Sequence, residues 1–224
     1  NAPFIVFDDA DIDKAIDGVI VSKFRNSGQT CVCANRILIH EKIYDQFSQK
    51  LVKIISKLKV GNGMDKDVNI GPMININAIK KIKGFLEDSI NKGGKILIGG
   101  KIIGKYFFEP TVISNASLEM NFSKEEIFGP IVPLFKFSSD KQAVNMANDT
   151  SYGLASYFYS QNVSRCWKVA EELEYGMVGI NEGLISTELA PFGGVKFSGI
   201  GREGSRYGIE DYLDIKYMCF GNIL

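Results

Sequence analysis

The sequence predicts an α/β fold with a largely parallel, open sheet flanked by helices. Segments with apolar residues at helical spacing alternate along the chain with short apolar runs typical of buried strands. Such alternation favours a parallel sheet, because a crossover helix then joins successive strands. A chain of 224 residues is long enough to bury a sizeable core. Open parallel sheets commonly bind ligands at the carboxyl ends of their strands, so we expect a site there.

The first elements are a short buried strand at residues 3–7 and a helix at residues 12–24. Apolar residues recur at helical spacing from Ile12 to Ile20, which predicts the helix. Acidic residues lie between the two elements, and their carboxylates can cap the helix: Asp8, Asp9 and Asp11. The helix therefore delivers the chain to the turn that contains Cys31.

The middle of the chain continues the alternation. An apolar stripe from Ile43 to Leu58 predicts a long amphipathic helix, which we expect to end at Gly61-Asn62-Gly63. The pair Gly93-Gly94 is expected to stop the next helix. The remaining elements are expected as strands at residues 36–39, 95–98, 107–113, 131–137 and 177–180, and as helices at residues 42–59, 77–92, 141–148 and 163–173.

Composition limits the classes of function. Lys and Arg number 26 and Asp and Glu number 26, so no net charge indicates a nucleic-acid partner. No apolar run approaches the roughly 20 residues that span a bilayer, so we expect no membrane partner. Four cysteines are scattered without metal-ligand spacing, which indicates no metal site and favours a reducing compartment, the cytoplasm or the mitochondrial matrix.

The segment Phe24–Arg36, FRNSGQTCVCANR, is the strongest candidate for chemistry. Cys31 follows a Ser-Gly-Gln-Thr turn between a predicted helix and a predicted strand. Thiolates attack carbonyl carbon readily, and N–H groups at such a turn can stabilise both a thiolate and the oxyanion formed after attack. We therefore interpret Cys31 as a nucleophile.

Two alternatives apply to Cys31. Free cysteines are among the most buried residues, so it is also compatible with a structural thiol. The single histidine, His40, lies at the end of a predicted strand and is expected to be a strand-end residue, so a Cys-His dyad is not favoured.

The same segment resembles the active-site segment of aldehyde dehydrogenases, in a form most similar to succinate-semialdehyde dehydrogenases. The resemblance continues through the whole chain in the order of the family. Six further stretches carry it: residues 1–7 (NAPFIVF), 69–72 (NIGP), 108–111 (FEPT), 125–130 (EEIFGP), 152–156 (YGLAS) and 191–196 (PFGGVK).

The resemblance implies that residues 1–210 form the thiol-bearing catalytic domain and that residues 211–224 form a C-terminal oligomerisation strand. It also implies NAD or NADP as cofactor, bound mainly by an N-terminal half that this chain lacks, together with the general-base glutamate. We expect a small aldehyde as substrate, a homo-oligomer (dimer or tetramer) for the full-length form, and little or no turnover by this chain alone.

Three residues are assigned by the resemblance to the cofactor and the substrate tunnel. The Glu126 carboxylate would accept hydrogen bonds from the nicotinamide-ribose hydroxyls, and Phe128 would pack nearby. Phe192 would line the substrate tunnel. The structural alternatives are a solvated helix cap for Glu126 and a core aromatic for Phe192.

Substrate choice is expected to depend on Arg25 and Ser186. An aldehyde with a distal carboxylate needs a cationic clamp, and a guanidinium offers a fork that lysine lacks. Arg25 lies six residues before Cys31, where the similar enzymes carry an arginine for that carboxylate. Ser186 matches their second carboxylate contact, although Thr187 is an alternative. Without a clamp, Arg25 would be an ordinary surface residue.

Cys33 lies two residues from Cys31 and carries a further hypothesis. A disulfide between the two would close a small, strained ring that is easily reduced, and it would block the nucleophile under oxidation. We therefore name Cys33 as a redox-switch candidate, as in some relatives, against the alternative of an inert thiol.

The sequence thus predicts oxidation of succinate semialdehyde to succinate with NAD(P)+ through a thiohemiacetal and a thioester on Cys31. Two rivals remain. The first is an aldehyde dehydrogenase for another aldehyde, such as glutarate semialdehyde or an uncharged one. The second is a truncated, non-catalytic interaction or redox module.

Overall fold

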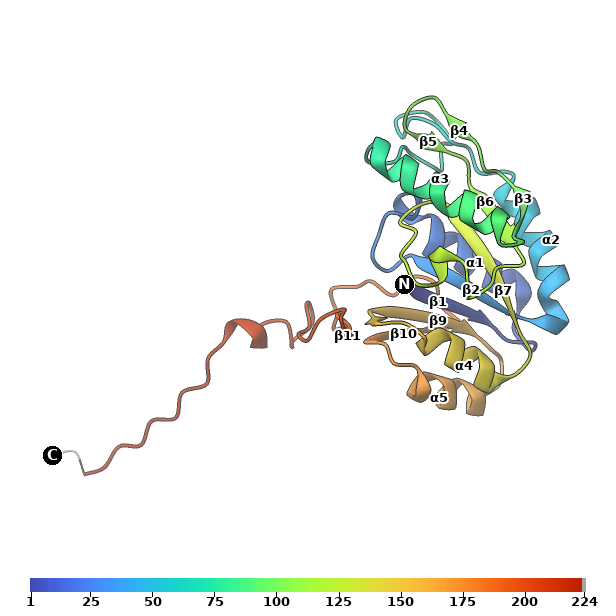
Figure 1. The fold of residues 1–224 in the computed structure, drawn as a ribbon. Helices are drawn as coiled ribbons and strands as arrows, with labels where there is room; N and C mark the ends of the chain where they lie inside the picture. Colours follow the sequence, from blue (N-terminus) through green and yellow to red (C-terminus); the bar gives the residue numbers. More distant parts are fainter. Residues whose placement is uncertain (223–224) are drawn as a thin grey trace.

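The computed structural model of the chain describes residues 1–222 and contains a seven-stranded sheet in the order β10-β9-β1-β2-β7-β6-β3 (Figure 1). All neighbouring strands are parallel except β3, which is antiparallel to β6. The strands are β1 Ala2–Val6, β2 Ala34–His40, β3 Lys95–Ile98, β6 Thr111–Ser114, β7 Ile131–Phe137, β9 Ala155–Tyr159 and β10 Met177–Ile180. The predicted α/β class with a largely parallel, open sheet is confirmed.

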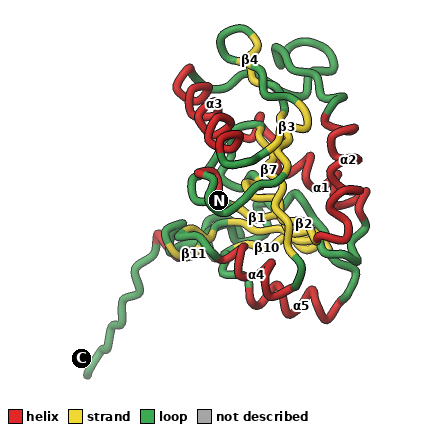
Figure 2. Tube along the Cα trace, turned by 45° about the vertical axis from the view of Figure 1, so that its right-hand side comes forward, coloured by secondary structure: helices red, strands yellow, loops and turns green. Residues whose placement is uncertain are grey.

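Helices cover both faces of the sheet, and Figure 2 shows α1 and α2 on one side of the strands and α3 on the other. The helices are α1 Ile12–Phe24, α2 Tyr44–Ile55, α3 Ile76–Asn91, α4 Asp140–Asn148 and α5 Val163–Glu172. Two short antiparallel pairs complete the fold: β4 Ile102–Ile103 with β5 Phe107–Phe108, and β8 Tyr152–Gly153 with β11 Val195–Lys196.

Alternation along the strands divides the core into two layers. In the first strand Phe4 and Val6 belong to the layer with α1 and α2, whereas Ile5 packs with α3, α4 and α5. Ile37 and Leu38 of β2 separate in the same way. Successive side chains of a strand point to opposite faces, so these buried apolar runs serve two helix layers at once.

The predicted helix at residues 12–24 and the strands at 131–137 and 177–180 are found with these bounds. Asp11 caps α1, accepting hydrogen bonds from the backbone N–H of residues 13 and 14 at 3.2 Å. Asp8 and Asp9 do not cap it; they form ion pairs with Arg165, at 3.4 and 2.6 Å.

The predicted helix at residues 42–59 is too long. A 3-10 turn, η2 Glu41–Ile43, precedes α2, which ends at Ile55 rather than near Gly61. The backbone N–H of Lys59 donates to the side chain of Asn69, and Val60 forms a β-bridge with Ile70. These contacts with a segment ten residues further on require a non-helical backbone at Lys59 and Val60. The apolar spacing alone would allow the helix to continue.

Strand β9 is absent from the predicted strands, although it lies inside the sheet, between β10 and β1. Its sequence contains Ser156, a polar residue that interrupts the apolar run. Ser156 is fully buried, and its hydroxyl is satisfied because it donates to the carbonyl of Met177 at 3.2 Å. Pairing with β1 and β10 therefore stabilises this strand, whereas its own residue pattern does not predict it.

The tail does not form the predicted C-terminal strand within one chain. After the 3-10 turn η4 Glu210–Tyr212, residues 213–222 pair with no strand of the described structure and extend away from the body (Figure 1). Apolar side chains such as Ile215 and Tyr217 are exposed there. A strand needs a hydrogen-bonded partner, so association through this segment stays a prediction; residues 223–224 lie outside the described structure.

Among residues 1–222, no helix has the length and the apolar character needed to cross a bilayer.

Candidate active site

Cys31 lies in the loop between α1 and β2, residues 25–33, which we call the thiol loop. It begins with the 3-10 turn η1 Arg25–Gly28, in which three successive residues have positive φ: Asn26 (48°), Ser27 (58°) and Gly28 (80°). Such a left-handed run reverses the chain sharply and leaves Cys31 exposed. The predicted turn before the thiol is therefore present.

Hydrogen bonds anchor the thiol loop to the segment before α3. The Ser27 hydroxyl donates to the carbonyl of Gly71 at 3.1 Å. The Gln29 amide donates to the carbonyl of Pro72 at 3.2 Å and accepts from the backbone N–H of Ile74 at 2.9 Å. Both side chains thus hold a loop that has little regular structure of its own.

Gly28 also lies directly against the backbone of Gly129. A Cβ at Gly28 would collide with the carbonyl of Gly129, and its φ of 80° already disfavours other residues. Gly129 belongs to residues 121–129, the loop that contains Glu126, which we call the carboxylate loop. The thiol loop and the carboxylate loop are therefore in backbone contact.

Cys31 lines a cavity of about 470 Å³ between these loops. Its other lining residues are Asn1, Lys81, Lys124, Glu125, Glu126, Tyr152, Leu154 and Ser198. Among the hydrogen bonds of the described residues, none involves the backbone N–H of Cys31 or Val32. These N–H groups are available to an oxyanion beside the thiol.

The cavity lies at the amino ends of the strands, and the expectation of a site at the carboxyl ends is wrong for it. Cys31 precedes β2, Glu126 precedes β7, and Asn1 precedes β1, and these three strands are parallel neighbours. The loops that enter the sheet, rather than those that leave it, therefore bring the thiol and the carboxylate together.

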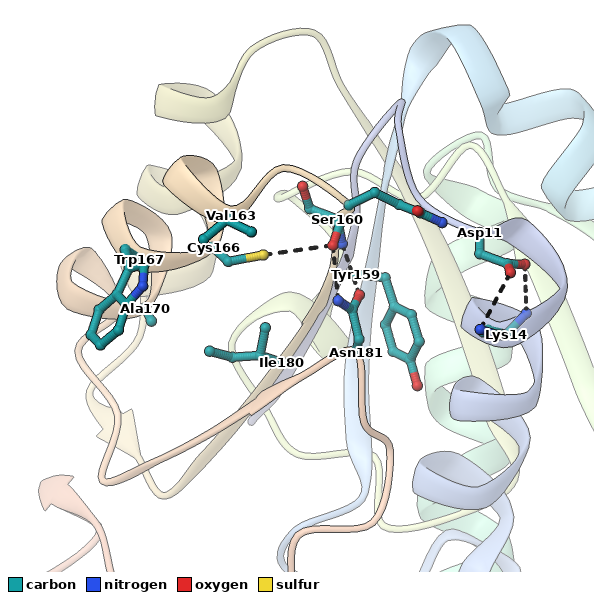
Figure 3. Close-up of a pocket in the computed structure, with 11 residues that line it drawn as sticks. Asp11, Lys14, Tyr159, Ser160, Val163, Cys166, Trp167, Ala170, Ile180 and Asn181 are labelled. Carbon is teal, nitrogen blue, oxygen red and sulfur yellow. Dashed lines mark hydrogen bonds and ion pairs between the residues drawn. The ribbon is translucent and has the colours of Figure 1, made fainter.

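A second cavity, of about 480 Å³, does lie at the carboxyl ends of β9 and β10 (Figure 3). Trp167 and Val163 of α5 border it, and Asp11 and Lys14 of α1 lie on its other side. It contains none of the predicted site residues. Within residues 1–222, no group of three or more His, Cys, Asp or Glu side chains is arranged to hold a metal ion.

Lys23 is a buried cation behind the thiol loop. It lies in the last turn of α1, is 1% exposed, and has no ion pair or side-chain hydrogen bond among those of the described residues. Burial lowers its pKa to about 8, against the opposing influence of nearby Cys33 and Glu126. A lysine with a lowered pKa therefore lies behind the thiol loop.

Arg25 and Ser186 lie together, in a narrow crevice that Val32 and Tyr157 also line. The Arg25 side chain is exposed and makes no ion pair among the described residues. The Tyr157 hydroxyl donates to the carbonyl of Val32 at 2.7 Å, and burial raises its pKa, while Arg25 acts in the opposite direction. Residues 161 positions apart in the sequence thus line one crevice, which is separate from the cavity that Cys31 lines.

Three further predicted residues do not line the cavity that contains Cys31. Cys33 is buried and its Sγ lies 2.8 Å from the Thr30 hydroxyl and 3.5 Å from the carbonyl of Arg25, so it lies inside the loop while Cys31 faces the cavity. Phe128 is 38% exposed and lies outside the residues that line the cavity. Phe192 packs partly on the core layer of α1 and α2, the position of a core aromatic.

Comparison with known proteins identifies the family of the chain. Residues 1–218 match the model of the aldehyde dehydrogenase family. The chain belongs to the aldehyde dehydrogenase family.

Among relatives of this aldehyde dehydrogenase chain, the glutarate-semialdehyde dehydrogenase of Pseudomonas putida is 57% identical over 98% of the chain and 46% of the relative. The mitochondrial succinate-semialdehyde dehydrogenase of Oryza sativa is 55% identical over 100% of the chain and 43% of the relative. A crystal structure of succinate-semialdehyde dehydrogenase from Burkholderia pseudomallei superposes with a TM-score of 0.97 at 57% identity, covering 98% of this chain and 46% of that one. The chain spans about half the length of the curated relatives it matches.

Several residues of this aldehyde dehydrogenase site are absent from the sequence predictions. Lys81 and Lys124 reach the cavity from α3 and from the carboxylate loop, and neither has a local motif. Buried Asn35 and Lys23 also belong to the surroundings of the thiol. Only Asn35 had a signal, because a polar residue that begins a buried apolar strand needs partners for its amide.

Proposed function

We propose that this chain is the catalytic, thiol-bearing half of an aldehyde dehydrogenase that oxidises succinate semialdehyde to succinate with NAD(P)+. One observation carries the proposal: an exposed Cys31 shares a cavity with the Glu126 carboxylate. A separate crevice, lined by Val32, the residue after Cys31, contains the Ser186 hydroxyl and the guanidinium of Arg25, which makes no ion pair among the described residues. A nucleophile, a cofactor carboxylate and a carboxylate clamp are the three parts that this reaction needs.

The residues of the chain would act as follows. The Cys31 sulfur adds to the aldehyde carbon, its proton leaves, and the carbonyl oxygen becomes an oxyanion near the backbone N–H groups of Cys31 and Val32. Loss of hydride from that carbon leaves a thioester on Cys31, and water then releases the acid and restores the thiol. The glutamate that the resemblance assigns as base precedes Asn1 in the family.

The residues around the cavity suit a nicotinamide nucleotide. Glu126 is half-buried and makes no ion pair among the described residues, so its carboxylate can accept hydrogen bonds from ribose hydroxyls. Lys81 and Lys124 add positive charge suited to phosphate groups. The cofactor, when bound, supplies the two-electron acceptor of the oxidation. Phe128 and Phe192 remain proposed contacts to cofactor and tunnel.

The Arg25 clamp separates succinate semialdehyde from uncharged substrates. The term full-length enzyme is used below for this chain joined to the N-terminal half that its relatives carry. In it, Arg25→Ala is expected to lower kcat/KM for succinate semialdehyde about 10- to 100-fold, because a hydrogen bond to a charged group contributes about 1.5–3 kcal/mol. The kcat/KM for butanal is expected to change less than about threefold. The measurement is the rate of reduced nicotinamide formation with each aldehyde.

Arg206→Ala, which removes another exposed arginine stacked on Tyr207, is the matched control and should affect neither substrate. Arg25→Lys should recover only part of the loss, since an ammonium lacks the guanidinium fork. An equal loss on both aldehydes in Arg25→Ala would exclude the clamp and favour an enzyme for uncharged aldehydes.

Glutarate semialdehyde is the second candidate substrate, favoured by the name of the 57% identical Pseudomonas putida relative. It carries the same distal carboxylate on a chain one methylene longer. The ratio of kcat/KM values for the two semialdehydes decides between them. If the full-length enzyme oxidises no aldehyde, the remaining hypothesis is that the chain is a non-catalytic interaction or redox module.

We also propose that Cys33 protects Cys31 under oxidation. Peroxide would convert the Cys31 thiolate to a sulfenic acid, and the Cys33 thiol would then condense with it, releasing water and forming a disulfide. Cys33 must first leave its contacts with Thr30 and the carbonyl of Arg25, which makes the switch a local rearrangement.

Hydrogen peroxide is expected to abolish the activity of the full-length enzyme, and dithiothreitol to restore it. In Cys33→Ala the loss should not be reversed, because Cys31 proceeds to irreversible oxidation states. Equal recovery in the variant and the parent would remove Cys33 from the account, and Cys166→Ala serves as the control for loss of a distant thiol.

A further inference from the structure

Asn35 is a buried amide at the start of β2, four residues after Cys31, and it is 1% exposed. Its position places it behind the thiol loop rather than in the cavity, which its side chain does not line. Polar groups buried to this extent are retained when their hydrogen bonds are made, so the partners of this amide indicate what it does.

The partners of the Asn35 side chain belong to Asn1 and to the carboxylate loop. Its Nδ2 donates to the side-chain oxygen of Asn1 at 2.6 Å, to the carbonyl of Phe122 at 3.0 Å and, at 3.4 Å, to the carbonyl of Glu125. Its Oδ1 accepts from the backbone N–H of Ile127 at 2.8 Å. The amide thus holds the carboxylate loop on both sides of Glu126.

Asn1 extends the same network. Its side-chain amide donates to the carbonyls of Ser123 and Lys124, at 3.0 and 3.3 Å. The carboxylate loop has only the short 3-10 turn η3 Asn121–Ser123 as regular structure, so these two side chains provide partners for several of its backbone groups. Lys81 adds one more contact, donating to the carbonyl of Glu126 at 2.6 Å.

Aspartate, alanine and serine would not reproduce this pattern. Aspartate would set carboxylate oxygens against the carbonyls of Phe122 and Glu125, since an ionised carboxylate only accepts hydrogen bonds. Alanine would leave the Ile127 N–H without a partner in a buried position. Serine offers one donor and too short a reach for both sides of the loop.

We propose that Asn35 is a positioning residue that sets the Glu126 carboxylate relative to the Cys31 thiol, and thereby the affinity for the nicotinamide nucleotide. The proposal deepens the proposed function, because it depends on Glu126 as the group that binds ribose. Asn35 belongs to the strand that follows the nucleophile, so its amide connects β2 to the loop that carries the cofactor carboxylate.

The test compares Asn35→Ala with Glu126→Gln in the full-length enzyme, through three measurements. Hydrogen exchange of residues 121–128 without cofactor reports the loop. Fluorescence titration gives the Kd for NAD+ and NADP+. Peptide mass spectrometry gives the rate at which iodoacetamide alkylates Cys31.

In Asn35→Ala we expect the Ile127 region to lose protection, the Kd to rise about tenfold, and the alkylation rate to stay within about twofold. Glu126→Gln is expected to raise the Kd similarly and to leave hydrogen exchange unchanged. Asn181→Ala is the control. The Asn181 amide makes two hydrogen bonds to the backbone of Ser160 at the carboxyl ends of β9 and β10, so its loss should leave the Kd unchanged.

Unchanged protection and unchanged Kd in Asn35→Ala would overturn the proposal. A parallel fall in alkylation rate would also overturn it, because it would show general loss of the site. If Glu126→Gln leaves the Kd unchanged, the role of Glu126 fails, while loss of protection in Asn35→Ala would still show that Asn35 holds the loop. Asn35→Ser removes less side-chain volume and carries the same expectations if the alanine variant does not fold.

Discussion

Cys31→Ala is expected to lower kcat of the full-length enzyme for succinate semialdehyde by at least about 10⁴-fold. Without the sulfur no covalent intermediate forms, and the described residues place no other thiol in the cavity. The measurement is formation of reduced nicotinamide, together with mass spectrometry of the acylated protein trapped with substrate. In the parent enzyme the added mass should map to Cys31.

Cofactor binding and folding should be unchanged in Cys31→Ala, because the side chain is exposed and makes no hydrogen bond among those of the described residues. Cys219→Ala is the matched control, since Cys219 is also exposed but lies in the tail, and it should retain activity. Residual activity within about tenfold of the parent, or an adduct on another residue, would contradict the mechanism.

Arg36→Ala is expected to lower the free energy of unfolding by at least about 2 kcal/mol, because hydrogen bonds to a charged group contribute about 1.5–3 kcal/mol each and buried carbonyls would lose a donor. The side chain is fully buried, and its guanidinium donates to the carbonyls of Met146 and Ala147 at 2.6 and 2.7 Å. It also donates to the carbonyl of Asn1 and to the Tyr175 hydroxyl, each at 3.1 Å. These bonds satisfy the last carbonyls of α4, which no N–H of that helix can reach.

Urea unfolding followed by far-ultraviolet circular dichroism measures this loss. Lys83→Ala provides the control, because Lys83 forms an exposed pair with Glu87 and should contribute less than about 0.5 kcal/mol. Arg36→Lys should remain strongly destabilised, since one ammonium cannot reach four acceptors on two segments. A loss below about 1 kcal/mol in Arg36→Ala would mean that water satisfies these carbonyls as well as the guanidinium does.

Local pattern was sufficient for much of the fold. The apolar spacing after Asp11 predicts α1, and the apolar runs of β7 and β10 predict those strands. These elements follow from local pattern because most of their apolar side chains are buried on the faces that the spacing indicates. The turn before Cys31 was also readable, since Ser27-Gly28 permits positive φ. The order of motifs around the thiol was enough to identify the family.

The tertiary structure alone decided how the site is assembled. Arg36 and Asn35 read as polar residues at the start of a strand, yet their partners lie about 90 to 110 residues away in sequence. The end of α2, the pairing of β9 and the placement of the cavity at the amino ends of the strands depend on the same kind of contact.

The sequence by itself therefore determined most of the helices and strands and the candidate nucleophile, because periodicity and turn chemistry act between near neighbours. The tertiary structure decided that Glu126 shares a cavity with that thiol and that the Asn35 amide holds the loop of Glu126. Hydrogen bonds and burial join residues that are distant along the chain, and no local pattern records them.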